Sequence, residues 1–480
     1  MSSTPAGTGL PDKMPDTDAK AEVAKAVARA RTAMDAFENL DQDRVDDVVR
    51  ALAWSIYKPE HARLLAELAV KETGLGNVAS KIIKNQRKTF GTLRDLLRVR
   101  TVGIISEEPE SGLVKYGKPV GVVGAVCPST NPAATPVNKA MMAVKGGNAV
   151  IIAPSPAGAV ATAKTVELMR AELRKTNHPE DLVQLLPPPV SKAMTEELVR
   201  QADLAVVTGS QDNVKRAMQS GTVTIGVGAG NVPVIIDSTA DLDDAAGKIC
   251  ASKIFDNSTS CSSENAVVIL DDIYEDAMAA LERAGGWRCS DAERENIRET
   301  LWVNGKLNRH LIAKDAAVLA EAMKLSGDAS AARFYMVEES VVGGKHSFAD
   351  EKLSLVLAVY RASDFDHAMR IARAILDVTG KGHSVGIHTA NMGHARALAA
   401  GTDVVRVLVN QAHTFGNGGS FDNCLPFTLS MGGGTWAGNT ISDNLNYRNF
   451  INITHLVTTI PEDKPSEADL FGPHWDRYGK

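Results

Sequence analysis

Short, uninterrupted apolar runs alternate with amphipathic helical segments between residues 120 and 236, and this alternation limits the possible folds more than any other feature. Strands of a parallel sheet are buried on both faces, so they read as continuous apolar runs of strand length. Such runs separated by helices indicate a parallel sheet with helices on both faces. We predict strands at 119–126, 149–153, 183–186, 204–207 and 232–236, and helices at 136–144, 157–174, 191–201 and 211–220.

The alternation resumes after Asp241 and predicts a second α/β unit. Apolar positions at helical spacing also predict three helices before the first unit. Glycine-rich stretches at 414–419 and 431–438 are predicted loops, and 113–115 is extended. The other predicted helices are 19–40, 41–72, 77–97, 242–252, 273–283, a helical region through 321, and 364–376; the other predicted strands are 266–270, 354–360, 384–388 and 450–457.

The composition of the 480 residues excludes several classes of protein. Lysine and arginine total 52 and aspartate and glutamate 58, and the resulting net charge of −6 argues against a nucleic-acid-binding protein. No apolar run reaches the roughly 18 to 20 residues of a membrane-spanning helix. The first twenty residues lack the apolar core of a secretory signal. We therefore expect a soluble, cytoplasmic protein without a membrane partner.

The five cysteines, at 127, 250, 261, 289 and 424, form no C-x-x-C pair. In a reducing compartment a single thiol is then free to act as a nucleophile. Cys261 lies among small polar residues (FDNSTSCSSEN, 255–265) just before an apolar strand, in a loop that a substrate can reach. Taken alone, a structural cysteine is the more common case, because free cysteines are among the most buried residues.

The segment CPSTNP (127–132) follows a predicted parallel strand. Ligands of open α/β sheets bind at the carboxyl ends of such strands. The side-chain amide of Asn131 is therefore a candidate donor to an oxyanion, and an ordinary Asn-Pro turn is the alternative interpretation.

Two glycine-containing segments, TGS at 208–210 and GVGAGN at 226–231, are candidate ligand loops. The second fails the G-x-G-x-x-G pattern of dinucleotide-binding loops, because Asn231 replaces the third glycine and a strand follows instead of a helix. EKLSLVL (351–357) places an acid at the start of a strand, where it is either a ligand for ribose hydroxyls or a solvated strand end. The histidines show no metal-binding spacing, so no metal is expected.

In this order, the segments resemble the aldehyde dehydrogenase superfamily, and within it the CoA-acylating branch. The resemblance extends from about residue 20 to about residue 460, and five ordered matches are far more specific than any one alone. It implies an α/β fold class, with two α/β domains built on parallel-type sheets and a small β oligomerisation element. The matching segments are CPSTNP (127–132), GVGAGNVPVIID (226–237), FDNSTSCSSE (255–264), EKLSLVL (351–357) and GTWAGN (434–439).

The resemblance also implies a division into three parts. An NAD(P)-binding domain is expected at 1–236, a catalytic domain at 237–433, and a C-terminal return with an oligomerisation tail at 434–480. The oligomerisation element would combine strands near 111–126 and near 444–458. A homodimer or homotetramer is therefore expected.

By the same resemblance, Cys261 is the nucleophile, and the amide of Asn131 and the Cys261 backbone N–H hold the oxyanion. NAD is the expected cofactor, with NADP as the open alternative, because a lysine found near Ser155 in many hydrolytic relatives is absent. His383 matches a family Gly-His-Thr segment and is either close to the active site or structural. The residues assigned to the cofactor are Ser129, Thr130, Ser155, Pro156, Gly209, Ser210, Gly226, Val227, Gly228, Glu351 and Leu353.

An absent carboxylate indicates the second substrate. Hydrolytic members of the superfamily carry a glutamate in the segment that matches 226–231, where it acts as the general base for water. Here the matching position is Gly226, and the segment contains no acid. Water attack without a base is slow, whereas a thiol is an intrinsically stronger nucleophile. The resemblance therefore implies coenzyme A as co-substrate and acyl-CoA as product.

The aldehyde is less well defined. Small aliphatic aldehydes, such as acetaldehyde and propionaldehyde, are the general expectation. The tail PSEADLFGPHW (465–475) resembles acylating sulfoacetaldehyde dehydrogenases, which adds sulfoacetaldehyde to the expected substrates. A buried sulfonate requires a cation or several N–H donors. The candidates are His413, Arg406 and the backbone amides of 416–419.

Two alternatives stay open at the level of sequence. An acyl-phosphate reductase of the same fold would also lack the glutamate, but it would not use coenzyme A. A non-catalytic, cofactor-binding scaffold or cargo protein of a bacterial microcompartment would use the amphipathic segment 21–37 for docking. Such a protein would have no need of Cys261 in its motif.

Overall fold

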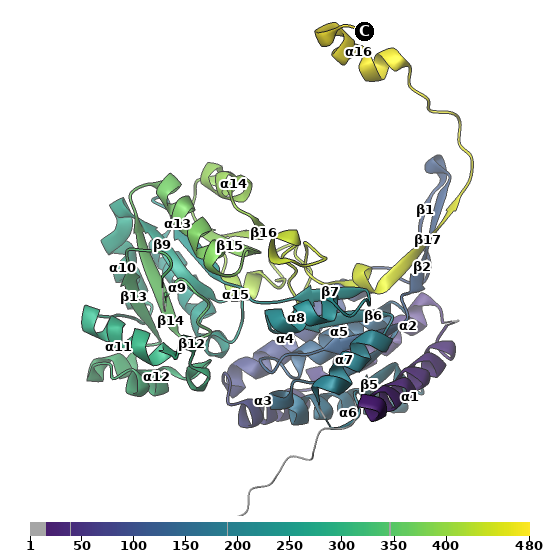
Figure 1. Cartoon of the computed structure of the whole chain (residues 1–480), viewed down its shortest axis with the longest axis horizontal. Coiled ribbons are helices and arrows are strands. Elements are labelled where there is room, and N and C mark those ends of the chain that lie inside the picture. Colours follow the sequence, from purple (N-terminus) through teal and green to yellow (C-terminus); the bar gives the residue numbers. More distant parts are fainter. Residues whose placement is uncertain (1–15, 39, 190, 345–346) are drawn as a thin grey trace, which may run out of the picture.

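The computed structural model describes residues 16–38, 40–189, 191–344 and 347–480. Two α/β units lie side by side, each built on one parallel sheet, and an antiparallel ribbon extends from the first unit (Figure 1). The predicted fold class, two α/β parts with parallel sheets and a small β element, is confirmed.

The first unit contains a five-stranded parallel sheet with the order β5-β4-β3-β6-β7. The chain adds β4 and β5 on one side of β3, then returns and adds β6 and β7 on the other side. Because parallel crossovers are right-handed, α5 and α6 cover one face and α7 and α8 the other. The carboxyl ends of β3 and β6 form the switch point at which such sheets bind ligands. The bounds are β3 (Val122–Val126), α5 (Ala134–Lys145), β4 (Ala149–Ala153), α6 (Ala159–Lys175), β5 (Val183–Leu185), α7 (Lys192–Gln201), β6 (Leu204–Thr208), α8 (Gln211–Met218) and β7 (Thr224–Val227).

Four N-terminal helices complete the first unit: α1 (Asp16–Asp35), α2 (Gln42–Tyr57), α3 (Pro59–Thr73) and α4 (Val78–Leu97). The prediction of one continuous helix at 41–72 is wrong, because Pro59 divides it. Lys58 adopts a ψ of 130° and Pro59 occupies the first turn of α3. The residue before a proline disfavours the helical conformation, whereas proline itself is favoured at a helix start.

The second unit contains a seven-stranded parallel sheet with the order β10-β13-β14-β9-β8-β15-β16. Strand β8 belongs to this sheet, although the predicted boundary at 236 places it in the first domain. The two sheets divide at 228–231 instead. The bounds are β8 (Val232–Ile236), α9 (Leu242–Ile254), β9 (Glu264–Leu270), α10 (Tyr274–Arg283), β10 (Gly286–Arg288), α11 (Asp291–Leu301), β11 (Trp302–Val303), β12 (Lys306–Leu307), α12 (Ala316–Ala322), β13 (Phe334–Glu339), β14 (Val356–Ala362), α13 (Phe365–Val378), β15 (Gly382–His388), α14 (Met392–Gly401), β16 (Val404–Val409) and α15 (His413–Gly416).

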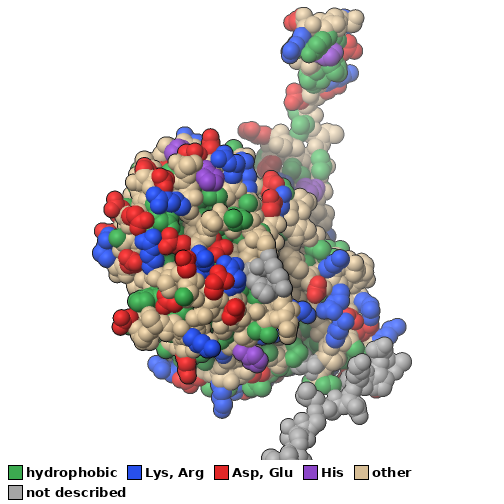
Figure 2. Space-filling view, turned by 60° about the vertical axis from the view of Figure 1, so that its left-hand side comes forward, with side chains coloured by type: hydrophobic (Ala, Val, Ile, Leu, Met, Phe, Trp, Pro, Cys, Tyr) green, Lys and Arg blue, Asp and Glu red, His purple; other side chains and the backbone are tan. Residues whose placement is uncertain are grey.

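A three-stranded antiparallel ribbon joins β1 (Gly103–Glu108), β2 (Leu113–Pro119) and β17 (Ile451–Val457). The chain reaches it by returning to the first unit, where Leu445 and Phe450 are buried in the core. Strand β17 is exposed along almost its whole length, and α16 (Glu467–Tyr478) buries no side chain. Figure 2 shows this helix standing clear of a surface on which charges of both signs are mixed. The segments near 111–126 and 444–458 therefore pair as predicted, and their role in oligomerisation stays a prediction.

Several elements were not predicted from the sequence, namely β1, β7, β10, β11, β12, β13, β16, α14 and α16. Strands β10, β11 and β12 interrupt the region predicted to be helical through 321, and α15 occupies part of the predicted loop at 414–419. The error at β7 affects the site, because Gly226 and Val227 were expected in a loop and instead form the end of a buried strand. In the described part of the chain, no helix is long and apolar enough to cross a membrane.

Candidate active site

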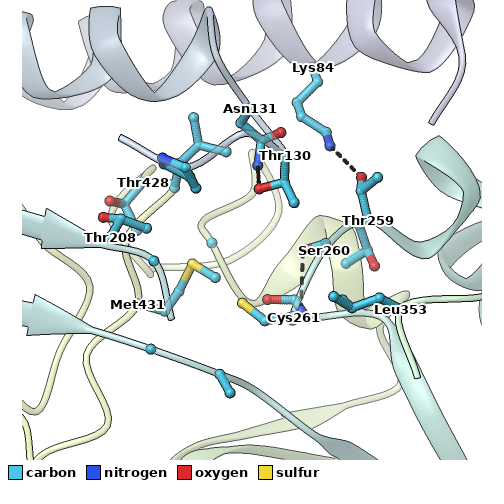
Figure 3. Close-up of a pocket in the computed structure, with 18 of the residues that line it drawn as sticks. Lys84, Thr130, Asn131, Thr208, Thr259, Ser260, Cys261, Leu353, Thr428 and Met431 are labelled. Atoms are coloured by element: carbon cyan, nitrogen blue, oxygen red, sulfur yellow. Dashed lines mark hydrogen bonds between the residues drawn. The ribbon is translucent and has the colours of Figure 1, made fainter. Parts of the chain in front are cut away.

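A cavity of about 460 Å³ lies where the two units meet. It is bounded by the carboxyl ends of β3 and β6, by the segments that lead into β8, β9 and β14, and by one side of α4 (Figure 3). The predicted residues Ser129, Thr130, Asn131, Gly209, Ser210, Gly228, Cys261, Glu351 and Leu353 all line it. Residues far apart in the sequence are thus brought to one site.

Cys261 lies in the short loop between α9 and β9. Asp256, Asn257 and Ser258, just before it, all have positive φ values of 51°, 53° and 60°. Such strain persists only where surrounding contacts impose it, and it concentrates at functional sites. Here the buried Asp256 carboxylate accepts hydrogen bonds from Lys84 Nζ at 2.6 Å and Lys81 Nζ at 3.0 Å. These contacts join the Cys261 loop to α4.

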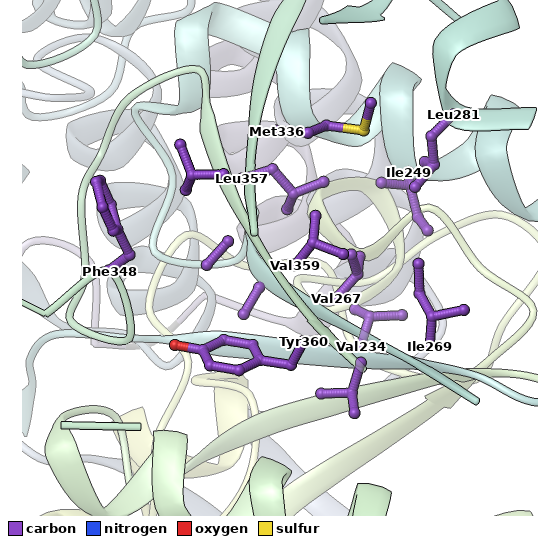
Figure 4. Packing of buried hydrophobic residues seen from close by; sticks show 14 of the residues in the cluster. Val234, Ile249, Val267, Ile269, Leu281, Met336, Phe348, Leu357, Val359 and Tyr360 are labelled. Carbon is purple, nitrogen blue, oxygen red and sulfur yellow. The ribbon is translucent and has the colours of Figure 1, made fainter. Parts of the chain in front are cut away.

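The strands behind the loop form a rigid base. Val267 of β9 and Leu357 and Val359 of β14 are fully buried in one apolar cluster (Figure 4). Lys352, also buried, donates to the carbonyl oxygens of Asn265 at 3.1 Å and Phe348 at 2.5 Å. The segments that carry Cys261 and Glu351 are therefore tied to each other and to the core.

Asn131 lies on the other side of the cavity, in the loop after β3. Its Nδ2 donates to Thr130 Oγ1 at 3.3 Å, and its buried Oδ1 has no partner among the described residues. Lys81 Nζ donates to the Thr130 backbone oxygen at 3.1 Å. Since Lys81 also binds Asp256, one lysine positions both the Asn131 loop and the Cys261 loop.

Glu351 is the only acidic side chain among the described residues that line this cavity. Burial raises its pKa to about 8, partly offset by a hydrogen bond from the Gly230 backbone N–H. At neutral pH the carboxyl is therefore mostly protonated. Burial, and then the charge of Glu351, raise the pKa of the Cys261 thiol to about 12, so without ligands Cys261 is a thiol.

This coupling predicts a pH-dependent effect of Glu351→Gln on the alkylation of Cys261 by iodoacetamide. At pH 7 the wild-type carboxyl is protonated, so the variant should react at the wild-type rate. At pH 9 the wild-type carboxylate opposes the thiolate, so the variant should react roughly three to ten times faster, equivalent to about half to one pKa unit. Mass spectrometry of cofactor-free protein measures the rates, with the exposed Cys424 as internal reference. Equal acceleration at both pH values would mean that the loop has loosened and would contradict the charge effect.

His383, at the start of β15, lies close to the nucleophile. A Cβ atom on Gly230 would lie 2.8 Å from His383 Nε2 and 2.9 Å from Cys261 Cβ, so both side chains meet at a point that only glycine leaves open. Burial and the nearby Arg406 hold the pKa of His383 well below its usual range. Its Nε2 is buried without a partner, whereas Nδ1 contacts Ser384 Oγ at 2.8 Å. The imidazole is therefore neutral, and its lowered pKa makes it a weak proton acceptor.

A second cavity, of about 840 Å³, adjoins the first and shares Pro128, Ser129, Thr208, Gly209 and Ser210 with it. The predicted residues Ser155 and Pro156 line this second cavity. Gly226 and Val227 line neither, because β7 buries them. A Cβ on Gly226 would lie 2.3 Å from Val214 of α8, so this glycine allows close packing and does not form a ligand loop.

The second cavity fits a dinucleotide. Its floor includes Ser210, which caps the N-terminus of α8 by accepting a hydrogen bond from the Asn213 backbone N–H. Unpaired N–H groups and the helix dipole favour a pyrophosphate at such an end. Lys192, Arg200 and Arg216 add positive charge to the same cavity. No group of three or more metal-binding side chains occurs within residues 16–38, 40–189, 191–344 and 347–480.

Only part of the set predicted from the sequence to bind a sulfonate lines the cavity. Arg406 and His413 line neither cavity. Arg406 is buried and donates to Asn417, Asn444 and the backbone oxygens of 383 and 432. Gly418 does line the active-site cavity, together with three basic residues that sequence reasoning missed, Lys84, Arg87 and Lys88 of α4. Their spacing of three and four residues on a predicted helix was the available signal.

The chain is similar to known proteins along most of its length. The chain matches the model of the aldehyde dehydrogenase family over residues 4–422. It is 48% identical over 480 residues to an acylating sulfoacetaldehyde dehydrogenase from Cupriavidus necator. The alignment covers 100% of this chain and 97% of that protein. A second such enzyme, from Bilophila wadsworthia, is 41% identical over 465 residues, covering 95% of this chain and 99% of that protein.

Among solved structures, an acetylating aldehyde dehydrogenase from Geobacillus thermoglucosidasius superposes with a TM-score of 0.89 at 33% identity, with 94% of this chain and 99% of that chain covered. The predicted resemblance to acylating members is confirmed. The chain belongs to the aldehyde dehydrogenase family.

Proposed function

We propose that the chain is a CoA-acylating aldehyde dehydrogenase that converts a short-chain aldehyde, sulfoacetaldehyde above all, to the acyl-CoA with NAD(P) as oxidant. One observation carries the proposal. Cys261 and Asn131 line one cavity whose only acidic side chain, among the described residues, is Glu351, and burial keeps that carboxyl protonated at neutral pH. The site thus holds a nucleophile and an oxyanion donor without a ready base for water.

The proposed reaction begins at the sulfur of Cys261. The thiol must lose its proton before it attacks, and the lowered pKa of His383 makes that imidazole a poor acceptor for it, so the proton passes to solvent. The thiolate attacks the aldehyde carbon, and the Asn131 amide and the Cys261 backbone N–H stabilise the resulting oxyanion. NAD(P), when bound in the second cavity, supplies a hydride acceptor. A thioester of Cys261 is then left for the thiol of coenzyme A to attack.

The cofactor and the aldehyde rest on separate arguments. The cofactor residues Ser155, Pro156, Gly209 and Ser210 line the second cavity, and NAD is the expected carrier. Initial rates with NAD and with NADP test that preference. The choice of sulfoacetaldehyde is supported by the two relatives of that name, which align with 95% or more of this chain.

The test of the proposal is the coenzyme A dependence of NADH formation, followed at pH 7 with sulfoacetaldehyde, acetaldehyde and propionaldehyde. With coenzyme A we expect continuous turnover and an acyl-CoA product. Without it we expect one stoichiometric burst as the thioester accumulates. The steady rate should then be slower by about 100-fold or more, because a missing general base costs about that much or more.

Three outcomes would contradict the proposal. An equal steady rate without coenzyme A would make the enzyme hydrolytic. Acyl phosphate formation with inorganic phosphate in place of coenzyme A would identify the acyl-phosphate alternative. Absence of NADH with every aldehyde would favour the non-catalytic alternative.

A further inference from the structure

One wall of the active-site cavity is basic. Lys84, Arg87 and Lys88 of α4 all line it. The acid that lines the same cavity, Glu351, is protonated at neutral pH, because burial raises its pKa to about 8. The cavity that contains Cys261 therefore carries positive charge and suits a negatively charged substrate.

The three cations differ in their partners. Lys84 is paired with Asp256, with Nζ and Oδ2 2.6 Å apart, and shares this carboxylate with Lys81. Among the described residues, Arg87 and Lys88 form no ion pair: Arg87 Nη2 donates to Ser420 Oγ at 2.8 Å, and Lys88 Nζ donates to the Gly418 oxygen at 2.7 Å. Burial, and then the neighbouring Arg87, lower the pKa of Lys88 to about 7. An anion beside this pair would relieve the cost of burying it.

Aromatic rings surround the Arg87 guanidinium in a position that suits an anionic ligand. Its guanidinium carbon lies 5.7, 5.1 and 5.7 Å from the ring centroids of Phe415, Phe421 and Phe427. Its Nε is buried without a hydrogen-bond partner among the described residues. Asp422 favours the charged form without pairing with it. A planar guanidinium fixed between aromatic rings is suited to an oxyanion with several oxygens.

Phosphate groups of NAD(P) or coenzyme A are the other anions that enter the enzyme. They have their own cations, because Lys192, Arg200 and Arg216 line the second cavity and not the first. Arg87 and Lys88 line the first cavity only, on the α4 side. The two sets of cations thus separate a phosphate region from a substrate region.

We propose that Arg87 and Lys88 form an anion subsite that binds the sulfonate of the aldehyde substrate while its carbonyl carbon faces Cys261. This inference deepens the proposed function and rests on it. It replaces Arg406 and His413 as the sulfonate-binding candidates.

The kinetic test compares Arg87→Gln with Arg94→Gln at saturating NAD and coenzyme A. Arg94 is the matched control, because it lies on the same helix over the same rings, Phe421 and Phe427, yet it pairs with Asp95 and lines neither cavity. Arg87→Gln should raise the KM for sulfoacetaldehyde by about 10- to 100-fold, the range expected for a lost hydrogen bond between charged groups. Its kcat/KM for neutral propionaldehyde should not change, and Arg94→Gln should affect neither substrate.

Equal loss with both aldehydes, or equal loss in both variants, would show a structural role and overturn the inference. A higher KM for coenzyme A or NAD, with that for sulfoacetaldehyde unchanged, would assign Arg87 to a phosphate and overturn it as well. If Arg87→Gln raised the KM only for succinate semialdehyde, the subsite would bind a carboxylate instead of a sulfonate, and the inference would also be overturned.

A binding measurement separates this inference from the proposed function. Isethionate carries the sulfonate but no aldehyde, so calorimetry with Cys261→Ala protein reports on the subsite without turnover. We expect binding that Arg87→Gln abolishes and Arg94→Gln preserves. If the Cys261→Ala protein did not bind isethionate while the wild type oxidised propionaldehyde in a CoA-dependent way, the anion subsite would be contradicted and the proposed function would still hold. If isethionate bound but the wild type oxidised no aldehyde, the proposed function would be contradicted and the anion subsite would still hold.

Discussion

Replacing Cys261 by alanine is expected to lower the steady rate of NADH formation by roughly 10⁴-fold or more, because the loss of a nucleophile costs about that much in comparable enzymes. The thiol lines the cavity between the two units, opposite Asn131, and no other cysteine among the described residues lines it. The initial burst should disappear together with turnover, since no thioester can form. Stopped-flow absorbance of NADH measures both quantities.

The matched control is Cys424→Ala. Cys424 is exposed and lines neither cavity, so its replacement should leave burst and turnover at wild-type values. Cys261→Ala should still bind NADH, because the cofactor region lies in the adjoining cavity. A Cys261→Ala protein that bound NADH and kept a measurable burst would remove Cys261 from the chemistry.

The core of the fold could be predicted because its strands are short and buried on both faces. Strand β4 is fully buried and coincides with the apolar run at 149–153. Strand β16 escaped prediction because Arg406 interrupts its apolar pattern. The guanidinium is satisfied by groups distant in the sequence, such as Asn444 and the Gly432 backbone oxygen. Only tertiary structure makes a buried arginine compatible with a strand there.

The residues of the site also fall into two groups, those that the sequence predicts and those that only the structure places there. Cys261, Asn131 and Glu351 lie in local motifs, so the sequence alone brought them forward, although their roles stay proposals. Arg87 and Lys88 belong to a helix whose charges resemble those of a solvated face. They become cavity residues only because the loop with Gly418 and Ser420 folds back over α4. The spacing of the basic residues on α4 was the one local signal in the sequence, and it does not predict that contact.

The role of Asp256 also follows only from the three-dimensional structure. Its replacement by alanine is expected to destabilise the protein by roughly 3–5 kcal/mol, the usual cost of removing one partner from a buried ion pair. The carboxylate is fully buried, and it binds Lys81, Lys84 and the Thr259 hydroxyl. Those two lysines hold its pKa below the usual range despite burial, so the carboxylate is charged. The measurement is the midpoint of thermal unfolding, for which an exposed pair supplies the control. Asp47 pairs with Arg50 at the surface, so Asp47→Ala should change the midpoint little.

The cause of the loss can be separated from simple loss of volume. In Asp256→Ala, Lys81 and Lys84 remain buried close together with no counter-charge, so a second replacement, Lys81→Met, should restore part of the stability. If the charges were not coupled, the two destabilisations would instead add. Activity should follow a different course, because Lys81 also holds the Thr130 oxygen beside Asn131. The double variant should therefore recover stability without recovering turnover, and recovery of both would contradict the view that Lys81 and Asp256 position the nucleophile and the oxyanion donor together.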